Sequence, residues 1–259
     1  MPVFTDYTLV CGVDRKHLNQ LRLTYPTWIK TKPSLLKQPM LLFYDCNQLT
    51  HSEVSRTINH PDITITPWPP AGVTYEGDNS KWYDAQRYKM LAGFVHIPGQ
   101  HVKTSYWLKL DTDVVATGQD DWIDPSWFDD SPLIVSHPWS FTKPADQMMI
   151  LDEWSRRDEV LKNHPPLNLI PKPGADRLGH RRIISWCAFF ATTFTAFCSV
   201  CTEDSKLPVP SQDGYMWYLA TLLGGVVKRV QMKTRGWEHW CTDNNIRLAV
   251  ERVMEQQRA

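Results

Sequence analysis

Two aspartates separated by one residue offer the clearest chemistry in the sequence. Asp111 and Asp113 follow Tyr-Trp-Leu-Lys-Leu, a run typical of a buried strand, so both carboxylates are expected where that strand ends. Carboxylate oxygens are the preferred ligands of hard divalent ions such as Mg²⁺ and Mn²⁺. An ion held there could neutralise the charge on a departing diphosphate. Because Asp-x-Asp pairs also arise by chance at solvated strand ends, the interpretation depends on the surrounding elements.

Those elements alternate between strands and helices through the first half of the chain. Apolar and β-branched runs predict strands at 8–13, 40–44, 63–66 and 106–110. Helical spacing predicts a helix that Pro26 closes, a short helix at 52–59 and a helix at 81–94. This order favours βαβ units and a mostly parallel sheet, and open sheets of that kind bind ligands at the carboxyl ends of their strands.

The second half is less regular. The same criteria predict strands at 133–136, 183–190 and 226–230, and helices at 145–162, 192–200, 212–223 and 244–257. The stretch 163–182 is rich in Pro, Gly and basic residues and is expected to form a surface loop. The fold class expected is therefore α/β, with one Rossmann-like domain over 1–259 and a central sheet flanked by helices.

Composition excludes several classes of protein. Lys plus Arg and Asp plus Glu both total 28, so the net charge is zero, which argues against a nucleic-acid-binding surface. No apolar stretch reaches membrane-spanning length and no signal peptide is evident, so a cytoplasmic enzyme is expected. The six cysteines lack a disulfide or zinc pattern and are expected to be reduced and mostly buried. Twelve tryptophans suit either core packing or contact with sugar rings.

The strand that runs into Asp111-Thr112-Asp113 resembles the DxD segment of GT-A glycosyltransferases. The stretch 81–91 is similar to the helix that precedes DxD in lipopolysaccharide hexosyltransferases and glycogenin, where a basic residue at the place of Arg87 contacts the nucleotide sugar. The resemblance implies a GT-A-type enzyme that uses Mn²⁺ or Mg²⁺. It would move a sugar from a nucleoside-diphosphate sugar to a glycan or other hydroxyl acceptor, with stereochemistry left open.

The same resemblance assigns expected roles to further residues. Residues from about 1 to 117 would bind the nucleotide sugar, and residues from about 118 to 259 would bind the acceptor. Contacts to the donor are expected from Val13, Asp45, Arg87, Asp111, Thr112 and Asp113, and acceptor contacts from Trp186 and Gln212. Asp213 is the expected catalytic residue near the anomeric carbon, although a carboxylate at a helix start can also be only a cap.

A histidine near the end of the chain completes the expected metal site. GT-A enzymes often bring a late histidine to the metal, and His239 lies in Gly-Trp-Glu-His-Trp, expected beyond the last strand. Glu238 is its rival as a ligand, and a lone histidine is more often a surface residue.

Two other functions remain open. Asp111-Thr112-Asp113-Val-Val also fits the nucleophile motif of haloacid-dehalogenase-type phosphatases, although that motif normally follows the first core strand. A non-catalytic carbohydrate-binding protein could use a tryptophan surface, but it would not need Asp111, Asp113 and Asp213 together.

Overall fold

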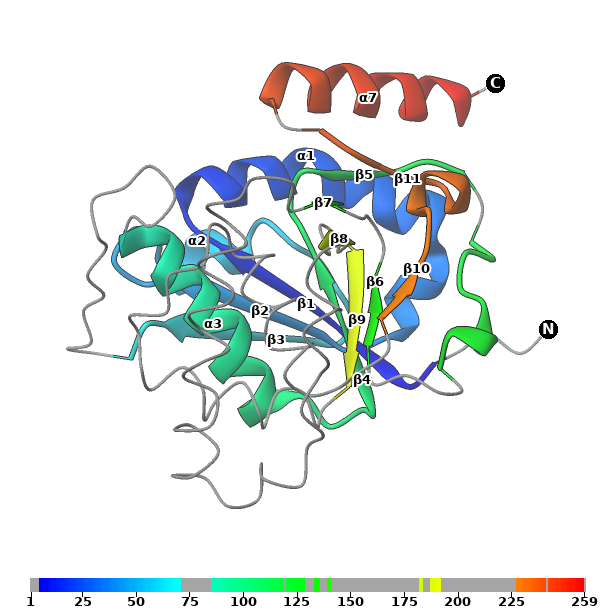
Figure 1. Ribbon diagram of the computed structural model, residues 1–259. Helices are drawn as coiled ribbons and strands as arrows, with labels where there is room; N and C mark the ends of the chain where they lie inside the picture. The colour runs from blue at the N-terminus through cyan, green and yellow to red at the C-terminus, as the bar shows by residue number, and fades with distance from the viewer. Residues whose placement is uncertain are drawn as a thin grey trace.

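A seven-stranded sheet forms the centre of the molecule (Figure 1). The computed structural model describes residues 5–70, 85–118, 120–128, 133–135, 139–140, 182–183, 187–191, 227–240 and 242–258. The strand order is β10-β6-β9-β4-β1-β2-β3. Its strands are β1 (Tyr7–Val13), β2 (Met40–Asp45), β3 (Ile63–Trp68), β4 (Tyr106–Leu110), β6 (Leu133–Val135), β9 (Cys187–Ala191) and β10 (Val227–Arg229).

Most neighbouring strands in this sheet are parallel, as the sequence predicts. β1 pairs in parallel with β2 and β4, β2 with β3, and β6 with β10. β9 is antiparallel to both β4 and β6. The expected α/β fold with a mostly parallel central sheet is therefore confirmed, and β9 is the strand that departs from it.

Helices cover both faces of the sheet. The helices are α1 (Arg15–Thr31), α2 (His51–Ser55), α3 (Ala85–His101) and α7 (Asp243–Gln256), with short 3-10 helices η1 (Pro33–Lys37), η2 (Pro125–Phe128) and η5 (Met232–Arg235). α3 packs against β1 and β2, α1 packs against β5, and α7 packs against α1 (Figure 1). The two largest helices of the first half therefore frame the carboxyl end of β1.

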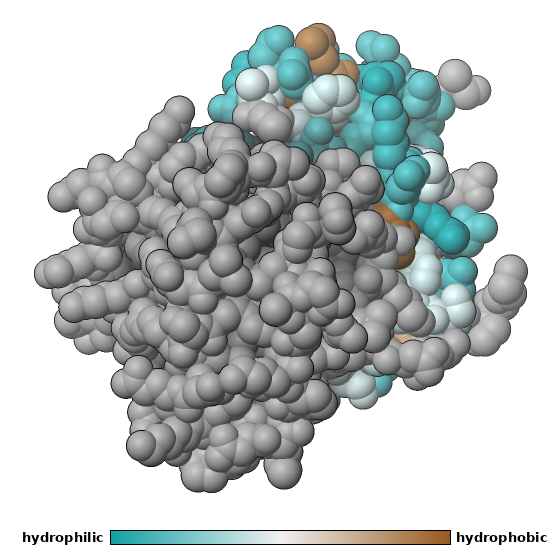
Figure 2. Space-filling view, in the orientation of Figure 1, coloured by the Kyte–Doolittle hydropathy of each residue, from teal (hydrophilic) through white to brown (hydrophobic). Residues whose placement is uncertain are grey.

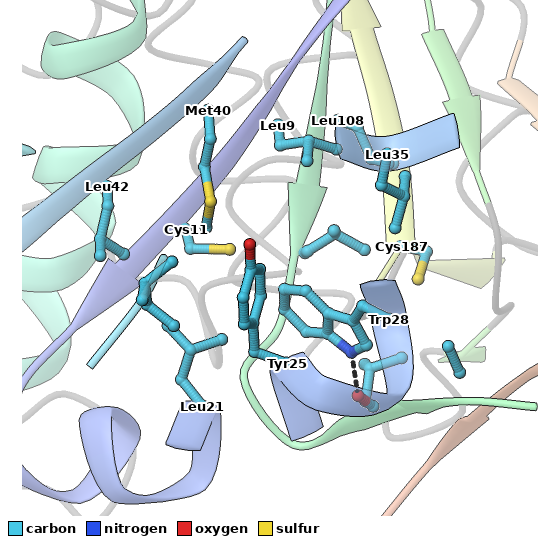
Figure 3. Packing of buried hydrophobic residues seen from close by; sticks show 14 of the residues in the cluster. Leu9, Cys11, Leu21, Tyr25, Trp28, Leu35, Met40, Leu42, Leu108 and Cys187 are labelled. Atoms are coloured by element: carbon cyan, nitrogen blue, oxygen red, sulfur yellow. Dashed lines mark hydrogen bonds between the residues drawn. The ribbon is translucent and has the colours of Figure 1, made fainter. Parts of the chain in front are cut away.

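Successive side chains of each strand point to opposite faces of the sheet, so that a hydrophobic core forms on each face. Leu9 and Cys11 of β1, with Leu108 of β4, face Tyr25 and Trp28 of α1 (Figure 3). The alternate residues point to the opposite face, where Phe43 of β2 packs edge-on against Phe94 of α3, with ring centroids 4.8 Å apart. A strand buried on both faces is typical of a parallel sheet between two helical layers.

Helix α1 continues through Pro26 for five more residues, so the prediction that Pro26 closes it is wrong. A proline inside a helix costs about 3 kcal/mol because it removes one hydrogen bond and crowds the preceding turn. Pro26 lies on the exposed side of α1, whereas its neighbours Tyr25 and Trp28 are buried in the core. Burial of two aromatic side chains offsets a penalty of that size, since each contributes about 1.5–3 kcal/mol.

A two-stranded sheet that the sequence does not predict joins distant parts of the chain. β5 (Val114–Ala116) pairs antiparallel with β11 (Trp237–His239). The segment 236–240, expected to lie beyond the last strand, therefore contains a strand of its own. The single strand expected at 183–190 is also corrected, because β8 (Arg182–Ile183) pairs instead with β7 (Trp139–Ser140) and only β9 joins the main sheet.

On the face that Figure 2 shows, the described residues are mostly hydrophilic, with a few hydrophobic ones among them. Among the described residues the only large hydrophobic side chain that is exposed is Leu248, on α7. None of the described helices is long and apolar enough to cross a bilayer. Cys11, Cys46 and Cys187 are free thiols, and burial raises the pKa of Cys11 and Cys187 above that of an ordinary thiol.

Candidate functional site

The turn after β4 directs Asp111 and Asp113 to one side of the chain and Thr112 to the other. The Thr112 side chain is buried, and its hydroxyl donates to Gln20 Oε1 of α1 at 3.0 Å. The Thr112 carbonyl accepts from the hydroxyl of Thr24, also on α1, at 2.8 Å. Thr112 therefore anchors the turn to α1, whereas the side chains of Asp111 and Asp113 remain about one fifth exposed, at 22% each.

Helix α1 also holds the strand that follows this turn. The Trp28 indole donates to the Val114 carbonyl at 2.6 Å (dashed line in Figure 3), and the Ala116 amide donates to the Thr27 hydroxyl at 3.1 Å. These bonds satisfy backbone groups of β5 that are buried away from water, which would otherwise cost about 1–3 kcal/mol each. The position of the two carboxylates is thus set by a buried polar face of α1.

Strand β11 brings His239 to the same place. In the antiparallel register His239 lies opposite Val114, and the Trp240 amide donates to the Asp113 carbonyl at 3.2 Å. The His239 Nε2 atom is 3.3 Å from Asp113 Oδ2. Ligand atoms of Asp111, Asp113 and His239 all lie within 4.8 Å of one another.

Two carboxylate oxygens and one imidazole nitrogen form a donor set that suits Mn²⁺ or a similar divalent ion. Three protein ligands leave positions for oxygen atoms of a bound phosphate group. The residues present therefore fit the metal that the sequence predicts, and the structure places all three predicted ligands together.

Glu238, the rival ligand, points elsewhere. Its carboxylate forms an ion pair with Arg252 of α7 at 2.5 Å. Successive side chains of a strand point to opposite sides, so β11 directs His239 to the aspartates and Glu238 to α7. The geometry favours His239 over Glu238 as the third ligand.

We expect His239→Ala to weaken Mn²⁺ binding by at least about tenfold, because one of three protein ligands is lost. Glu238→Gln is the matched control, since it alters the adjacent residue of the same strand and should leave Mn²⁺ affinity within about twofold. Calorimetric titration of both variants with Mn²⁺ gives the two affinities to be compared. Equal losses in the two variants would show that β11 contributes only through its fold.

A cleft of about 140 Å³ adjoins the two aspartates. Its lining combines carboxylates with apolar side chains, and the described residues that form it are Gly12, His17, Met90, Phe94, Leu110, Asp111, Thr112 and Asp113. Pockets for whole small-molecule ligands usually measure about 300–1,000 Å³, so this cleft is sized for part of a nucleotide.

A histidine that the sequence reasoning missed lines this cleft. The His17 Nδ1 atom is 2.6 Å from Asp14 Oδ1, which leaves Nε2 as the nitrogen that can meet a ligand. Burial alone would raise the pKa of Asp14, but the hydrogen bonds and charge of His17 outweigh burial and lower that pKa well below its usual range. The spacing of Asp14, which caps α1, and His17 three residues later is the sequence signal that could have identified the pair.

Asp14 also belongs to a polar network that fixes helix α3. Gln86 of α3 donates to both Asp14 and Asp45 at 3.1 Å, and Lys89 pairs with Asp45 at 2.6 Å. Asp45, predicted to contact the nucleoside, is fully buried, and the structure uses its carboxylate to hold α3. Val13, another predicted contact, is fully buried in the core shared with α1. Neither residue lines the described cleft.

Four further residues were predicted to contact the donor, the acceptor or the reacting sugar. Arg87 lies in α3 beside Gln86, in the helix that flanks the cleft, and its side chain is outside the described part. Trp186, Gln212 and Asp213 lie outside the described residues.

A buried lysine fixes the segment that carries His239. The Lys32 ammonium donates to the Arg235 carbonyl at 3.0 Å and lies 5.0 Å from the ring centroid of Trp237. Burial lowers the pKa of Lys32 to about 8, and the charges of Cys187, Asp120 and Asp121 oppose part of that shift. Lys32 thus links the end of α1 to the segment that leads into β11.

No protein-family model and no curated protein matches the sequence. Solved structures share the fold at low identity. The mannosyltransferase Ktr4p of S. cerevisiae, solved with GDP, is 10% identical, with a TM-score of 0.53 over 91% of this chain and 71% of its own. The galactosyltransferase LgtC, solved with donor and acceptor sugar analogues, is 10% identical, with a TM-score of 0.52 over 97% of this chain and 99% of its own.

A third neighbour is named for a different reaction. The 4-diphosphocytidyl-2C-methyl-D-erythritol synthase of Anaerococcus prevotii is also 10% identical, with a TM-score of 0.54 over 96% of this chain and 99% of its own. The chain spans only about two thirds of the fungal chains it matches, from 60% to 71% of their length. The structure thus confirms the expected GT-A, Rossmann-like fold, shared with glycosyltransferases, with the Asp-x-Asp pair at the end of a central strand.

Proposed function

We propose that the chain is a metal-dependent glycosyltransferase that moves a sugar from a nucleoside-diphosphate sugar to an acceptor hydroxyl. The observation that carries the proposal is the convergence of Asp111, Asp113 and His239 beside a cleft at the carboxyl end of β1 and β4. Ligands of open α/β sheets bind at this edge. Support also comes from the shared fold, since Ktr4p is described with GDP and LgtC with donor and acceptor sugar analogues.

In this proposal each described residue has a defined task. A bound Mn²⁺ or Mg²⁺ supplies Lewis-acid stabilisation of the leaving diphosphate. Asp111, Asp113 and His239 hold it. His17, oriented by Asp14, presents Nε2 to a nucleotide in the cleft, and the apolar side of the cleft at Met90 and Phe94 excludes water from one flank.

The donor and acceptor halves, about 1–117 and about 118–259, remain proposals, as do donor contacts from Arg87 and acceptor contacts from Trp186 and Gln212. Asp213 is proposed to act on the sugar or the acceptor. If the reaction inverts the anomeric centre, Asp213 would be the base for the acceptor hydroxyl. If the reaction retains it, Asp213 would position the sugar or acceptor for attack on the same face.

We expect Asp213→Asn to lower turnover by about 100-fold or more, while donor affinity changes little. Asparagine keeps the size and the capping ability of aspartate but removes its charge and basicity. Turnover and nucleotide-sugar affinity should be measured on the same two proteins. Unchanged turnover would assign Asp213 to helix capping and remove it from the reaction.

The other functions fit the described residues less well. Six tryptophans are buried, which withdraws them from a sugar-binding surface: Trp28, Trp68, Trp107, Trp122, Trp127 and Trp237. A dehalogenase-type phosphatase normally carries its nucleophile after the first core strand, whereas Asp111 follows β4, the fourth strand of the main sheet in chain order.

The reaction products test the proposal directly. The protein is incubated with Mn²⁺ and a panel of nucleoside-diphosphate sugars, with water or simple glycosides as acceptors, and nucleoside diphosphate release is measured. A parallel set with nucleoside triphosphates and sugar or polyol phosphates tests for pyrophosphate release, the product expected of a nucleotidyltransferase. Mn²⁺-dependent release of nucleoside diphosphate supports glycosyl transfer, whereas pyrophosphate release without it contradicts the proposal.

A further inference from the structure

His17, near the start of α1, is a polar side chain of the cleft that does not belong to the metal site. Its backbone amide and its Nδ1 atom lie 2.9 and 2.6 Å from Asp14 Oδ1. Gln86 donates to the other oxygen of Asp14 at 3.1 Å. Protein groups thus engage both oxygens of Asp14, which is only 7% exposed, so His17 is the member of the pair that reaches the cleft.

The pairing with Asp14 determines which nitrogen of His17 is left for a ligand. Burial alone would raise the pKa of Asp14, but the hydrogen bonds and charge of His17 lower that pKa well below its usual range, so the carboxyl group is ionised. An ionised carboxylate only accepts hydrogen bonds, so Nδ1 of His17 must donate. The Nε2 atom then accepts when the ring is neutral and donates when the ring is charged. A hydroxyl group suits Nε2 in both states, because a hydroxyl both donates and accepts.

The other polar side chains of the described lining narrow the chemistry of the ligand. Asp111 and Asp113 can only accept, and one oxygen of Asp111 is already paired with Lys109. The Thr112 hydroxyl is committed to α1. These side chains therefore offer acceptors and, at most, the single donor of His17. A nucleobase edge carries acceptor atoms that would find at most that one donor, and phosphate oxygens are repelled by the carboxylates wherever no metal ion lies between them.

A ribose fits the same lining. It is bonded directly to the diphosphate of a nucleotide, so it lies next to a diphosphate held by the metal, and its two neighbouring hydroxyls can donate to acceptors. Its C–H groups can pack on the apolar side chains of Met90 and Phe94. The transferred sugar on the other side of the diphosphate must lie open to the acceptor. The described lining comes instead from residues between 12 and 113, within the half proposed to bind the nucleotide.

We propose that His17 is a specificity-determining residue, which hydrogen-bonds a ribose hydroxyl through Nε2 and so selects ribonucleotides over deoxyribonucleotides. The inference rests on the proposed function, because it places a nucleoside diphosphate in the cleft. A site that hydrogen-bonds a hydroxyl discriminates against the analogue that lacks it, since the polar group of the site is then left unpaired. Asp14 acts through His17 as a positioning residue.

The test measures what one hydroxyl contributes to binding. Calorimetry at saturating Mn²⁺ first identifies the tightest ligand among UDP, GDP, ADP and CDP, and then gives the affinities of its 2′-deoxy and 3′-deoxy analogues. The ratio of the ribonucleotide affinity to that of each analogue is determined for the native protein and for His17→Phe, which keeps a planar ring without its nitrogens. The change in this ratio is a double-mutant cycle, in which general effects of the substitution on fold and affinity cancel.

We expect the native protein to bind at least one of the two deoxy analogues about tenfold more weakly than the ribonucleotide. In His17→Phe the two affinities should agree within about twofold. His101→Phe is the matched control and should keep the native ratio, because His101 is an exposed histidine at the end of α3 opposite Gln86. If His17→Phe does not fold, His17→Leu provides the same comparison.

Three results would overturn the inference and leave the proposed function standing. They are equal native affinities for the ribonucleotide and both analogues, a native selectivity that persists in His17→Phe, and a loss of affinity in His17→Phe that is the same for all three ligands. The last result would assign His17 to the base or the phosphates. A native protein that binds none of the four nucleoside diphosphates in a Mn²⁺-dependent manner contradicts the proposed function itself.

Discussion

Asp113→Ala is expected to reduce Mn²⁺-dependent binding of UDP or GDP by more than about 100-fold, the largest effect anticipated for a single side chain of the site. The substitution removes one carboxylate ligand and the acceptor beside His239 Nε2. The backbone should be unaffected, because Asp113 is held through its carbonyl by Trp240 and through its neighbour Thr112 by α1. Calorimetric titration with nucleotide at fixed Mn²⁺, repeated after chelation, gives the measurement.

Asp62→Ala is the control for this experiment. Asp62 is an exposed aspartate that precedes β3, at the edge of the sheet opposite the metal ligands. Its replacement removes the same charge from the protein without touching the cleft, so nucleotide affinity should stay within about twofold. If Asp113→Ala binds nucleotide as tightly as Asp62→Ala does, the metal site is not at Asp111 and Asp113.

Gly236→Ala should destabilise the protein by about 3–5 kcal/mol and weaken Mn²⁺ binding as a result. Gly236 has a φ of 75° and ends η5 directly before the strand that carries His239. An added Cβ would overlap the Thr117 carbonyl oxygen, which belongs to backbone and cannot rotate away. Either the fold loses stability or β11 shifts, and in both cases His239 moves relative to the aspartates.

Gly118→Ala separates overlap from backbone strain. Gly118 also has a positive φ, of 97°, but an added Cβ there would meet its nearest neighbour, Gly236 Cα, at an ordinary 3.7 Å. It should therefore cost only the strain of a non-glycine residue at positive φ, about 1–3 kcal/mol. Urea denaturation gives both free energies of unfolding. Equal values for the two variants would refute the steric argument at Gly236.

Features encoded by local pattern were predictable from the sequence. β1, β2, β4 and α7 lie within a residue or two of their predicted bounds, because buried strands and amphipathic helices have clear periodicities. Asp111 and Asp113 were found for the same reason, since a recognisable strand leads into them. Helix α1 shows where a local rule fails. The tertiary contacts of Tyr25 and Trp28 outweigh the helix-breaking tendency of Pro26, although Trp28 continues the helical spacing.

Features that depend on distant parts of the chain were not predictable in the same way. β5 and β11 have three residues each, too few to show any period, and they are defined by pairing with each other across more than a hundred residues of sequence. His239 was therefore proposed through a resemblance, and its strand was missed. Lys109 did carry a local signal, because it is a charged residue at an inward position of an apolar strand. Its ion pair with Asp111 and its contact with the ring of Phe94, however, are visible only in the folded structure.

The attachment of β11 has a consequence for the order in which the molecule assembles. Lys32 and Arg235, whose bond secures this strand, are 203 residues apart in the chain, and Gln20 and Asp243, which join α1 to α7, are 223 apart. Contacts of such high sequence separation close large loops and tend to form late in folding. An ion that binds only when His239 has docked adds its binding free energy to that last step. The metal would then stabilise the docked form of the carboxyl-terminal segment. The concentration of the ion would therefore set how often this segment detaches from the rest of the fold.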